Sequence, residues 1–181
     1  IDYRFGSEYE DEGIKLGEFK INEITYVEIK GMSLELDPVY GAYIGVNLYI
    51  DASDNASLYF DDMPVTPDGE ELKLVIDDNT GIKKIQYRCA VKEIADIHKL
   101  VACDGDGNTI DLSIDQYTDV EEFTYSGMSY CDAVLAGGTV YSDELKDVCN
   151  ALIEFNEQAR YYFEYNNDGL NVGSVTADIP T

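Results

Sequence analysis

The sequence predicts a mainly β protein, an antiparallel β-sandwich of about eight or nine strands with two C-terminal α-helices packed on it. Between residues 19 and 126, short stretches of alternating apolar and polar residues recur at roughly ten-residue spacing, which is typical of antiparallel sandwiches. After Ser126 the apolar residues recur with the period of an α-helix instead. The length of 181 residues favours a single domain that buries a core without help from metals or disulfides.

Residues 1–18 form an acidic leading segment with a short edge strand around 14–16. Residues 19–36 alternate apolar and polar side chains, which predicts two strands or one bulged strand with Gly31 at the bend. Residues 38–41 are expected to form a loop. The apolar residues that mark the alternating stretch are Ile21, Ile24, Tyr26, Ile29, Met32, Leu34 and Leu36.

Further strands follow, separated by turns rich in Asp, Asn, Gly and Pro. The stretch 91–99 predicts a short helical turn between two strands, with Ile94 and Ile97 pointing inward. In the strand 42–51, one face carries Ile44, Val46, Leu48 and Ile50. The remaining strands are expected at 56–62, 71–77, 82–91, 98–104, 109–115 and 121–126.

The helical part covers residues 127–170, after the sandwich of 19–126 and before a tail or edge strand at 171–181. A short helix over 128–136 ends at two glycines, and a longer one begins at Ser142, a good N-cap, and ends at 166–169. Tyr161, Tyr162 and Tyr165 are expected to fix its end onto the sandwich. The inward face of the long helix is predicted to carry Leu145, Val148, Cys149, Leu152, Phe155, Ala159 and Phe163.

The charge excludes several classes of partner. Thirty-seven acidic against twelve basic residues give a net charge of −25, which repels nucleic-acid backbones and anionic membranes. The apolar stretches are too short to span a bilayer, so we expect no membrane insertion. The acidity also favours a soluble monomer. Beyond a solvated acidic surface, the specific hypotheses are cation binding and attraction of a basic partner.

The sequence offers little catalytic chemistry. His98 is the only histidine, and no GxSxG, P-loop, HExxH or GxGxxG pattern occurs. Acidic residues are so abundant that pairs of carboxylates arise by chance. We therefore expect no enzyme, no catalytic residue and no cofactor other than calcium.

Calcium enters through Asp104, Asp106 and Asn108, whose alternating oxygen atoms resemble the start of a calcium-binding loop. The resemblance fails at Thr109, where the sharp-turn glycine should stand. A hairpin turn built on Asp-Gly explains the same residues, so both interpretations remain open.

The four cysteines are spaced for two bridges. Cys89–Cys103 would join neighbouring strands, and Cys131–Cys149 would join the two helices. Free buried thiols are the alternative, because unpaired cysteine is among the most buried residue types. A zinc site is not expected, since no CxxC pair occurs.

Fifteen tyrosines and no tryptophan suggest another kind of site. Sugar-binding sandwiches stack aromatic rings on pyranose rings while polar groups bind the hydroxyls. Tyr40, Tyr43, Tyr49 and Tyr59 lie on or beside strands and are the candidate ligand-binding residues. The alternative is that these are half-buried strand tyrosines without a ligand.

Three stretches of the chain resemble a known module: YIGVNLYID at 43–51, the segment ending in DGDGN at 85–108, and the helical segment at 121–170. The order and spacing are similar to an uncharacterised β-sandwich plus helical-pair module in secreted, cellulosome-like surface proteins of gut and rumen Clostridia. The long helix departs from the module's pattern at Glu154–Arg160, where bulkier polar residues replace small ones. The cysteines lie outside that pattern as well.

The resemblance implies a secreted or cell-surface location and neighbouring domains in a larger protein. It implies no active site. We expect a non-catalytic accessory module that attaches to plant or host polysaccharide. The alternative is a structural spacer with no ligand of its own.

Overall fold

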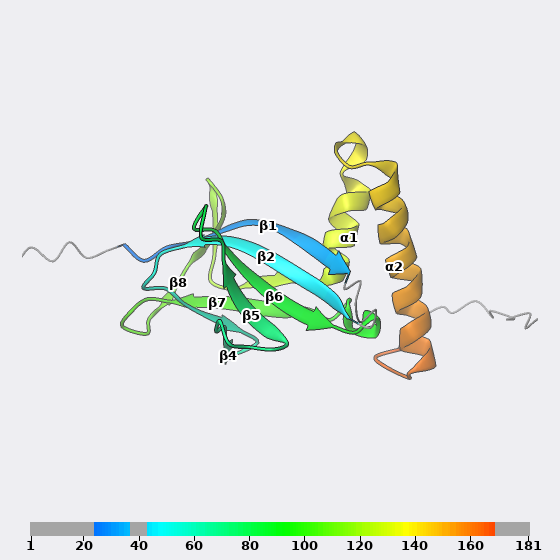
Figure 1. Cartoon of the computed structure of the whole chain (residues 1–181), viewed down its shortest axis with the longest axis horizontal. Helices are drawn as coiled ribbons and strands as arrows, with labels where there is room; N and C mark the ends of the chain where they lie inside the picture. Colours follow the sequence, from blue (N-terminus) through cyan, green and yellow to red (C-terminus); the bar gives the residue numbers. More distant parts are fainter. Residues whose placement is uncertain (1–23, 37–42, 169–181) are drawn as a thin grey trace, which may run out of the picture.

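The computed structural model describes residues 24–36 and 43–168, and it confirms the β-sandwich with a C-terminal helix pair. Two sheets pack face to face (Figure 1). The six-stranded sheet has the order β10-β9-β1-β2-β6-β5. Its strands are β1 (Val27–Leu36), β2 (Ile44–Ala52), β5 (Leu72–Ile76), β6 (Lys83–Cys89), β9 (Leu112–Asp115) and β10 (Thr118–Val120).

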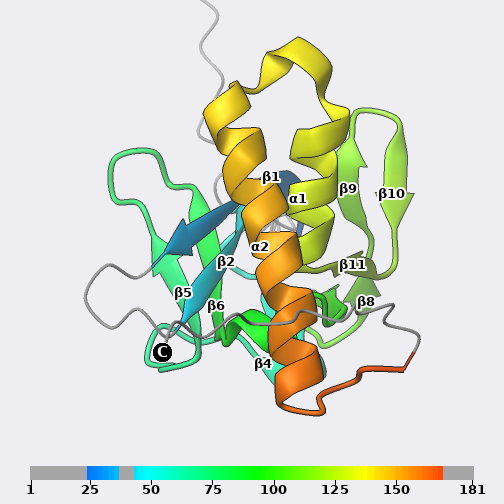
Figure 2. The same ribbon diagram turned by 90° about the vertical axis from the view of Figure 1, so that its right-hand side faces the viewer.

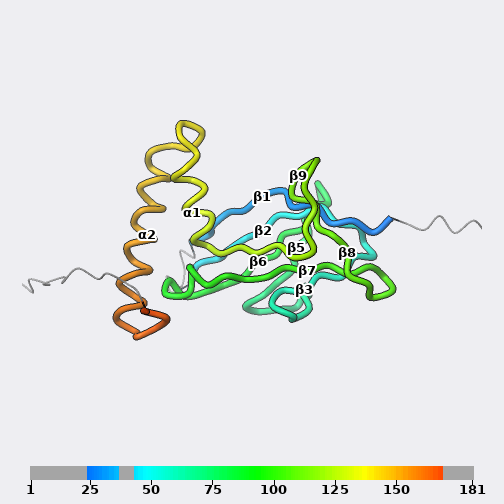
Figure 3. The backbone as a smooth tube through the Cα atoms, turned by 180° about the vertical axis from the view of Figure 1, so that it is seen from behind, coloured from blue at the N-terminus to red at the C-terminus, as the bar shows by residue number. Residues whose placement is uncertain are grey.

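The five-stranded sheet lies behind it and has the order β11-β7-β3-β4, with β8 also paired to β7 (Figure 3). The described residues form eleven strands, which is more than predicted. The predicted strand 109–115 divides in two, and the short strands β4 and β10 were not expected. The strands are β3 (Ser57–Phe60), β4 (Met63–Pro64), β7 (His98–Cys103), β8 (Thr109–Ile110) and β11 (Phe123–Tyr125).

The N-terminal alternation forms one bulged strand rather than two. Within β1 the partners change from Ile29 opposite Ile50 to Gly31 opposite Tyr49, so one extra residue is accommodated next to the glycine, as predicted. The leading segment, with its expected edge strand at 14–16, lies outside the described residues.

The core lies between the sheets, where alternate residues of each strand point inward. Ile44, Val46, Leu48 and Ile50 of β2 are all buried, as the alternation predicted. Lys83 is the polar exception. Its amine donates to the carbonyl oxygens of Ala52 at 2.9 Å and Ser53 at 3.2 Å, which replaces the lost hydration.

The two helices, α1 (Gly127–Ala136) and α2 (Asp143–Tyr162), stand side by side across one end of the sandwich (Figure 2). Ser126 caps α1 by accepting the Ser129 amide at 3.0 Å, and Ser142 caps α2 as predicted. The long helix ends earlier than expected, because left-handed backbone at Glu164 and Asn166 (φ 52° and 41°) follows it.

The inward face of α2 is narrower than the sequence suggests. Leu145, Cys149, Leu152 and Ala159 pack inward. Val148, Phe155 and Phe163 are 43%, 61% and 61% exposed, so their predicted burial is wrong. Apolar residues occupy two adjacent stripes of this helix. Periodicity alone could not tell which stripe meets the sandwich.

The connection between β6 and β7 (residues 90–97) joins the sandwich to both helices. It contains the short 3₁₀ turn η2 (Val91–Glu93), followed by Ile94, which is 1% exposed. The Ile94 carbonyl accepts the Met128 amide of α1 at 2.9 Å, and the Val91 carbonyl accepts Nδ2 of the buried Asn156 of α2 at 2.8 Å. Ile97, predicted to point inward, is exposed instead.

The same connection holds the chain after α2. The Tyr165 hydroxyl donates to the Asp96 carboxylate at 2.5 Å, which raises the pKa of Tyr165 to about 12. The Lys92 amine lies 5.4 Å from the ring centre of Phe163 and 4.9 Å from that of Tyr165. Tyr161 and Tyr162 are exposed and do not fix the helix end, so the prediction holds for Tyr165 alone.

Gly127 permits the close approach of α1 to this connection, and its substitution tests the packing. A Cβ atom at Gly127 would lie 2.4 Å from Cγ1 of Ile94. We expect Gly127→Ala to lower the free energy of unfolding by about 1–3 kcal/mol, because the neighbouring isoleucine must shift. Urea denaturation measures the change.

The control is Gly105→Ala, where a Cβ atom meets nothing within 4 Å and stability should stay within about 0.5 kcal/mol. Ile94→Ala should cost about 2–5 kcal/mol on its own. The double variant Gly127→Ala/Ile94→Ala should cost less than the sum of the two single changes. Strict additivity would show that the two residues do not compete for space.

Candidate ligand-binding face

The outer surface of the six-stranded sheet carries a continuous set of polar side chains, which we name the polar face. Residues alternate between core and solvent along each strand, and the register places the outward ones of β1, β2, β6 and β5 side by side. These strands lie next to one another across the sheet (Figure 1). The polar face consists of Ser33, Glu35, Tyr43, Gly45, Asn47, Tyr49, Lys73, Val75, Lys84, Gln86 and Arg88.

Hydrogen bonds connect the centre of the polar face across three strands. Asn47 Nδ2 donates to Ser33 Oγ at 3.3 Å and to Glu35 Oε2 at 3.5 Å. Gln86 Nε2 donates to the same Glu35 oxygen at 2.9 Å, and the Lys84 amine lies 3.9 Å from it. Glu35 therefore accepts two hydrogen bonds and pairs with the Lys84 amine, which fixes these side chains relative to one another.

Tyr49 and Asn47 lie at this centre on adjacent outward positions of β2. The Tyr49 hydroxyl shares a hydrogen bond of 3.2 Å with Ser33 Oγ, so its ring is held in place by a polar contact. Asn47 is only 2% exposed, and its Oδ1 has no hydrogen-bond partner among the described residues. A buried acceptor without a protein partner is a typical position for an ordered water or a ligand hydroxyl.

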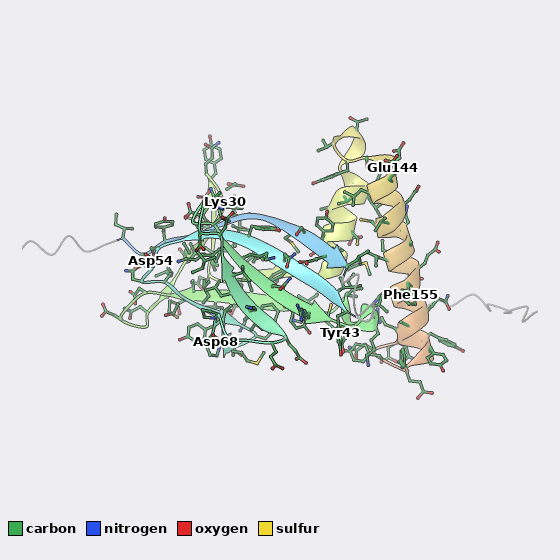
Figure 4. The ribbon with its side chains drawn as sticks, viewed as in Figure 1. Lys30, Tyr43, Asp54, Asp68, Glu144 and Phe155 are labelled. Atoms are coloured by element: carbon green, nitrogen blue, oxygen red, sulfur yellow. The ribbon has the colours of Figure 1, made fainter. Side chains whose placement is uncertain are left out.

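Two depressions lie at the ends of this network. The larger has a volume of about 400 Å³ and is lined by Tyr49, Val75, Asp77, Thr80, Ile82 and Lys84. The smaller, of about 20 Å³, is lined by Glu35, Tyr43, Gly45, Gln86 and Arg88. Tyr43 is 52% exposed and lies toward the helical end of the sandwich (Figure 4). Each depression thus combines a tyrosine with cationic and hydrogen-bonding groups.

The four candidate tyrosines do not form one surface. Tyr43 and Tyr49 both belong to the polar face. Tyr59 of β3 does not, because its neighbours Leu58 and Phe60 point into the core and it therefore faces outward from the opposite sheet. Tyr40 lies outside the described residues. Ligand binding by Tyr43 and Tyr49 stays a prediction.

His98 forms a hydrogen bond with Asp61 at one end of the sandwich. Its Nδ1 lies 2.7 Å from Asp61 Oδ2, and its ring stacks on Phe60 with centroids 4.7 Å apart. Asp61 also accepts the Lys99 amide at 2.8 Å, so the pair ties the turn after β3 to β7. Among the described residues no hydroxyl or thiol is hydrogen-bonded to His98, and we assign the pair a structural role.

Asp104, Asp106 and Asn108 form the turn between β7 and β8. Asp104 Oδ1 accepts the amides of Asp106 at 2.9 Å and Asn108 at 2.8 Å, and Oδ2 accepts Asn108 Nδ2 at 3.1 Å. Gly107 provides the left-handed residue, with φ 85°. Both Asp104 oxygens are thus used within the turn, which favours the hairpin interpretation. Within the described ranges no three His, Cys, Asp or Glu side chains are grouped to hold a metal, and calcium stays a prediction.

The cysteines are all free thiols in the structure, and one of the two expected bridges is incompatible with it. Cys89 ends β6 and points into the core, whereas Cys103 ends β7 in the other sheet and points outward. His98 begins β7 next to Tyr87, with ring centroids 4.5 Å apart, and Cys103 lies five residues further on. Five residues of strand span about 17 Å, far beyond disulfide reach, so the Cys89–Cys103 pairing is wrong.

Cys131 of α1 and Cys149 of α2 meet in the buried interface between the helices. Their thiols are close enough to affect each other's ionisation. Burial first, and then the neighbouring Cys149 thiol, raises the pKa of Cys131 to about 12. A thiol with so high a pKa reacts slowly near neutral pH. Because the two cysteines meet between the helices, a Cys131–Cys149 bridge fits the fold, and it stays a prediction.

Sequence reasoning missed most of the polar face. It identified Tyr43 and Tyr49, but not the residues between them, such as Asn47, Gln86 and Arg88. A signal was present, because the outward positions of 44–50 and 83–89 carry amide and cationic side chains. The sequence does not show that β2 pairs with β6, because three other strands lie between them in the chain.

Comparison of the chain with protein-family models, with curated proteins and with solved structures finds no match. Among residues 24–36 and 43–168, no helix combines the length and apolar character that a membrane crossing requires.

Refolding in a glutathione redox buffer tests the helix bridge. Oxidised glutathione exchanges with the two thiols and leaves as two reduced molecules, so the chain loses two hydrogen atoms. We expect peptide mapping to find Cys131 linked to Cys149. Closing a loop of this size should stabilise the fold by about 3 kcal/mol. Cys131→Ser is the control, which should show neither the mass loss nor the stabilisation, and a link involving Cys89 or Cys103 would contradict the assignment.

Asp104→Asn tests the turn. The hydrogen bonds from Asn108 and the turn amides lower the pKa of the Asp104 carboxyl in the folded protein. The carboxylate therefore stabilises the fold above its ordinary pKa, and this contribution disappears as pH falls through the lowered value. We expect the variant to melt at a lower temperature at pH 7 and at the same temperature as the parent in strong acid. A melting temperature of the parent that rises with calcium and falls with chelator would instead support a metal site.

Proposed function

We propose that this protein is a non-catalytic module that binds carbohydrate on the polar face. The observation that carries the proposal is the hydrogen-bonded network of Ser33, Glu35, Asn47 and Gln86, with Tyr49 and Tyr43 at its two ends. Side chains that contact only water do not have to be fixed relative to one another in this way. Such preorganisation reduces the entropy lost on binding.

The groups of the polar face suit a sugar. Hydroxyls of a sugar both donate and accept hydrogen bonds, and the face offers carboxylate, amide, hydroxyl and cationic partners. Tyrosine rings offer flat apolar surfaces to the C–H faces of pyranose rings. The depressions at Tyr49 and Tyr43 are separated along β6 by the span from Lys84 to Arg88, about 13 Å for four residues of strand. An extended oligosaccharide matches this elongated site better than a single monosaccharide.

We place the module outside the cell, as a monomer in a larger polysaccharide-binding or polysaccharide-degrading protein. The resemblance to surface-protein modules supports this location. The net charge of −25 fits a soluble exposed module and disfavours nucleic acid as the ligand.

A structural spacer without a ligand is the second candidate. The observation that favours it is the exposed apolar stripe of α2, formed by Val148, Phe155 and Tyr162 at seven-residue spacing. In a larger protein, a neighbouring domain could cover this stripe. The spacer hypothesis predicts a folded module that binds no polysaccharide.

Affinity electrophoresis in gels containing plant polysaccharides tests the proposal, followed by calorimetry with the best ligand. We expect the protein to be retarded by at least one polysaccharide. Tyr49→Ala and Tyr43→Ala should each weaken binding about tenfold, or about 1.4 kcal/mol, because each removes an aromatic contact surface.

Tyr59→Ala is the matched control, since Tyr59 is also a partly buried strand tyrosine but faces outward from the opposite sheet. It should leave binding unchanged. Equal losses for all three variants would argue against the polar face as the site. A folded protein that no polysaccharide retards would favour the spacer.

A further inference from the structure

We infer that the ligand of the polar face is an acidic glycan, whose carboxylate or sulfate groups pair with Arg88 and Lys73. The inference rests on the proposed carbohydrate binding and specifies the class of sugar. It depends on a comparison of the basic side chains within the described residues, in a chain where acids outnumber bases by three to one (37 against 12).

The described residues contain nine lysines and arginines, and seven of them have partners. Five lie in ion pairs: Lys30, Lys83, Lys84, Lys99 and Lys146. Lys92 lies over the rings of Phe163 and Tyr165, and Arg160 donates to the carbonyl oxygens of Tyr165 and Asn166. Seven of the nine basic side chains in the described part of the chain thus have internal partners.

The two that remain are Lys73 and Arg88, which have no ion pair or side-chain hydrogen bond with the described part of the chain. Both are exposed and both belong to the polar face. Lys73 of β5 lies opposite Gln86 of β6, and Arg88 lies two residues beyond Gln86 on the same side. Such diagonal neighbours are about 7–8 Å apart.

Two acids lie beside these cations on the outer surface of the sheet, Glu71 and Glu35. Glu71 stands opposite Arg88, whose amide donates to its carbonyl oxygen at 2.8 Å, but its carboxylate forms no ion pair with Arg88 or Lys73. Glu35 already accepts from Asn47 and Gln86 and lies near the Lys84 amine. Within the described residues, Arg88 and Lys73 therefore keep charges that no carboxylate pairs with, on a protein that is acidic as a whole. The net charge of −25 repels an acidic polymer, so general electrostatic attraction cannot replace these two residues.

The surroundings of Arg88 suit an acidic sugar in particular. Arg88 and Tyr43 line the same depression, so a sugar ring that lies on Tyr43 has its acidic group beside the guanidinium. The planar guanidinium can bind a carboxylate or a sulfate through two parallel hydrogen bonds. Lys73 is placed to meet a further acidic group, whereas Gln86 between them serves hydroxyls.

Matched polymers test the inference by calorimetry at low and physiological salt. Polygalacturonate is compared with its methyl ester, which has the same backbone without the charge, and dextran sulfate with dextran. We expect at least tenfold tighter binding to one charged member than to its neutral counterpart, with a preference that weakens as salt rises. Preference in the first pair identifies a carboxylate, and preference in the second identifies a sulfate.

Arg88→Gln and Lys73→Gln should each reduce this preference severalfold, measured as the ratio of the affinities for the charged and the neutral member of each pair. Lys146→Gln is the control, because it removes the same charge from α2, where Lys146 pairs with Asp143. Circular dichroism confirms that each variant is folded.

Equal binding to charged and neutral members would overturn the acidic ligand and leave the carbohydrate proposal standing. A charge preference that survives Arg88→Gln and Lys73→Gln, or that Lys146→Gln reduces equally, would also overturn it. Absence of binding to every polymer, charged or neutral, would remove the proposed function itself.

Discussion

Close packing around the β6–β7 connection holds the sandwich and the helices together. Ile94 fills the space between the sheets and the start of α1, and the Gly127 backbone approaches it so closely that a side chain does not fit. On the other side, the buried Asn156 of α2 donates to the Val91 carbonyl. Both helices thus depend on one short segment, and their position across the end of the sandwich follows from it. None of the helices and strands in residues 24–36 and 43–168 covers the outer surface of the six-stranded sheet.

The fold class could be predicted because its signals are local. Alternation identified the main strands, Gly31 marked the bulge, and Ser126 and Ser142 marked the helix starts. The predictions of burial that were wrong concern places where two residues fit the sequence pattern equally well. Ile94 and Ile97 both suit burial, but the turn after η2 directs only Ile94 inward. Val148 and Phe155 repeat with the helical period, yet the sandwich contacts the adjacent stripe of α2.

The candidate site was less predictable, because it depends on which strands are neighbours. The polar face combines β1, β2, β6 and β5, and the pairing of β2 with β6 joins residues about 40 positions apart. The same limitation affected the cysteines. Cys89 and Cys103 lie on consecutive predicted strands, but β7 crosses to the other sheet and runs away from Cys89. Cys131 and Cys149 were easier, since two consecutive antiparallel helices bring their facing residues together.

The two ends of the described chain lie at opposite ends of the molecule's long axis, and this bears on how the polar face would be placed in a larger protein. The described chain begins at Ile24 at one end of the sandwich and finishes beyond α2 at the opposite end (Figure 1). In a polypeptide with several such modules, each module would follow the previous one along a common long axis. The polar faces would then lie along the side of this array, away from the contacts between consecutive modules. Several weak contacts to one long polymer could therefore act together, and the avidity of the array would exceed the affinity of any single module.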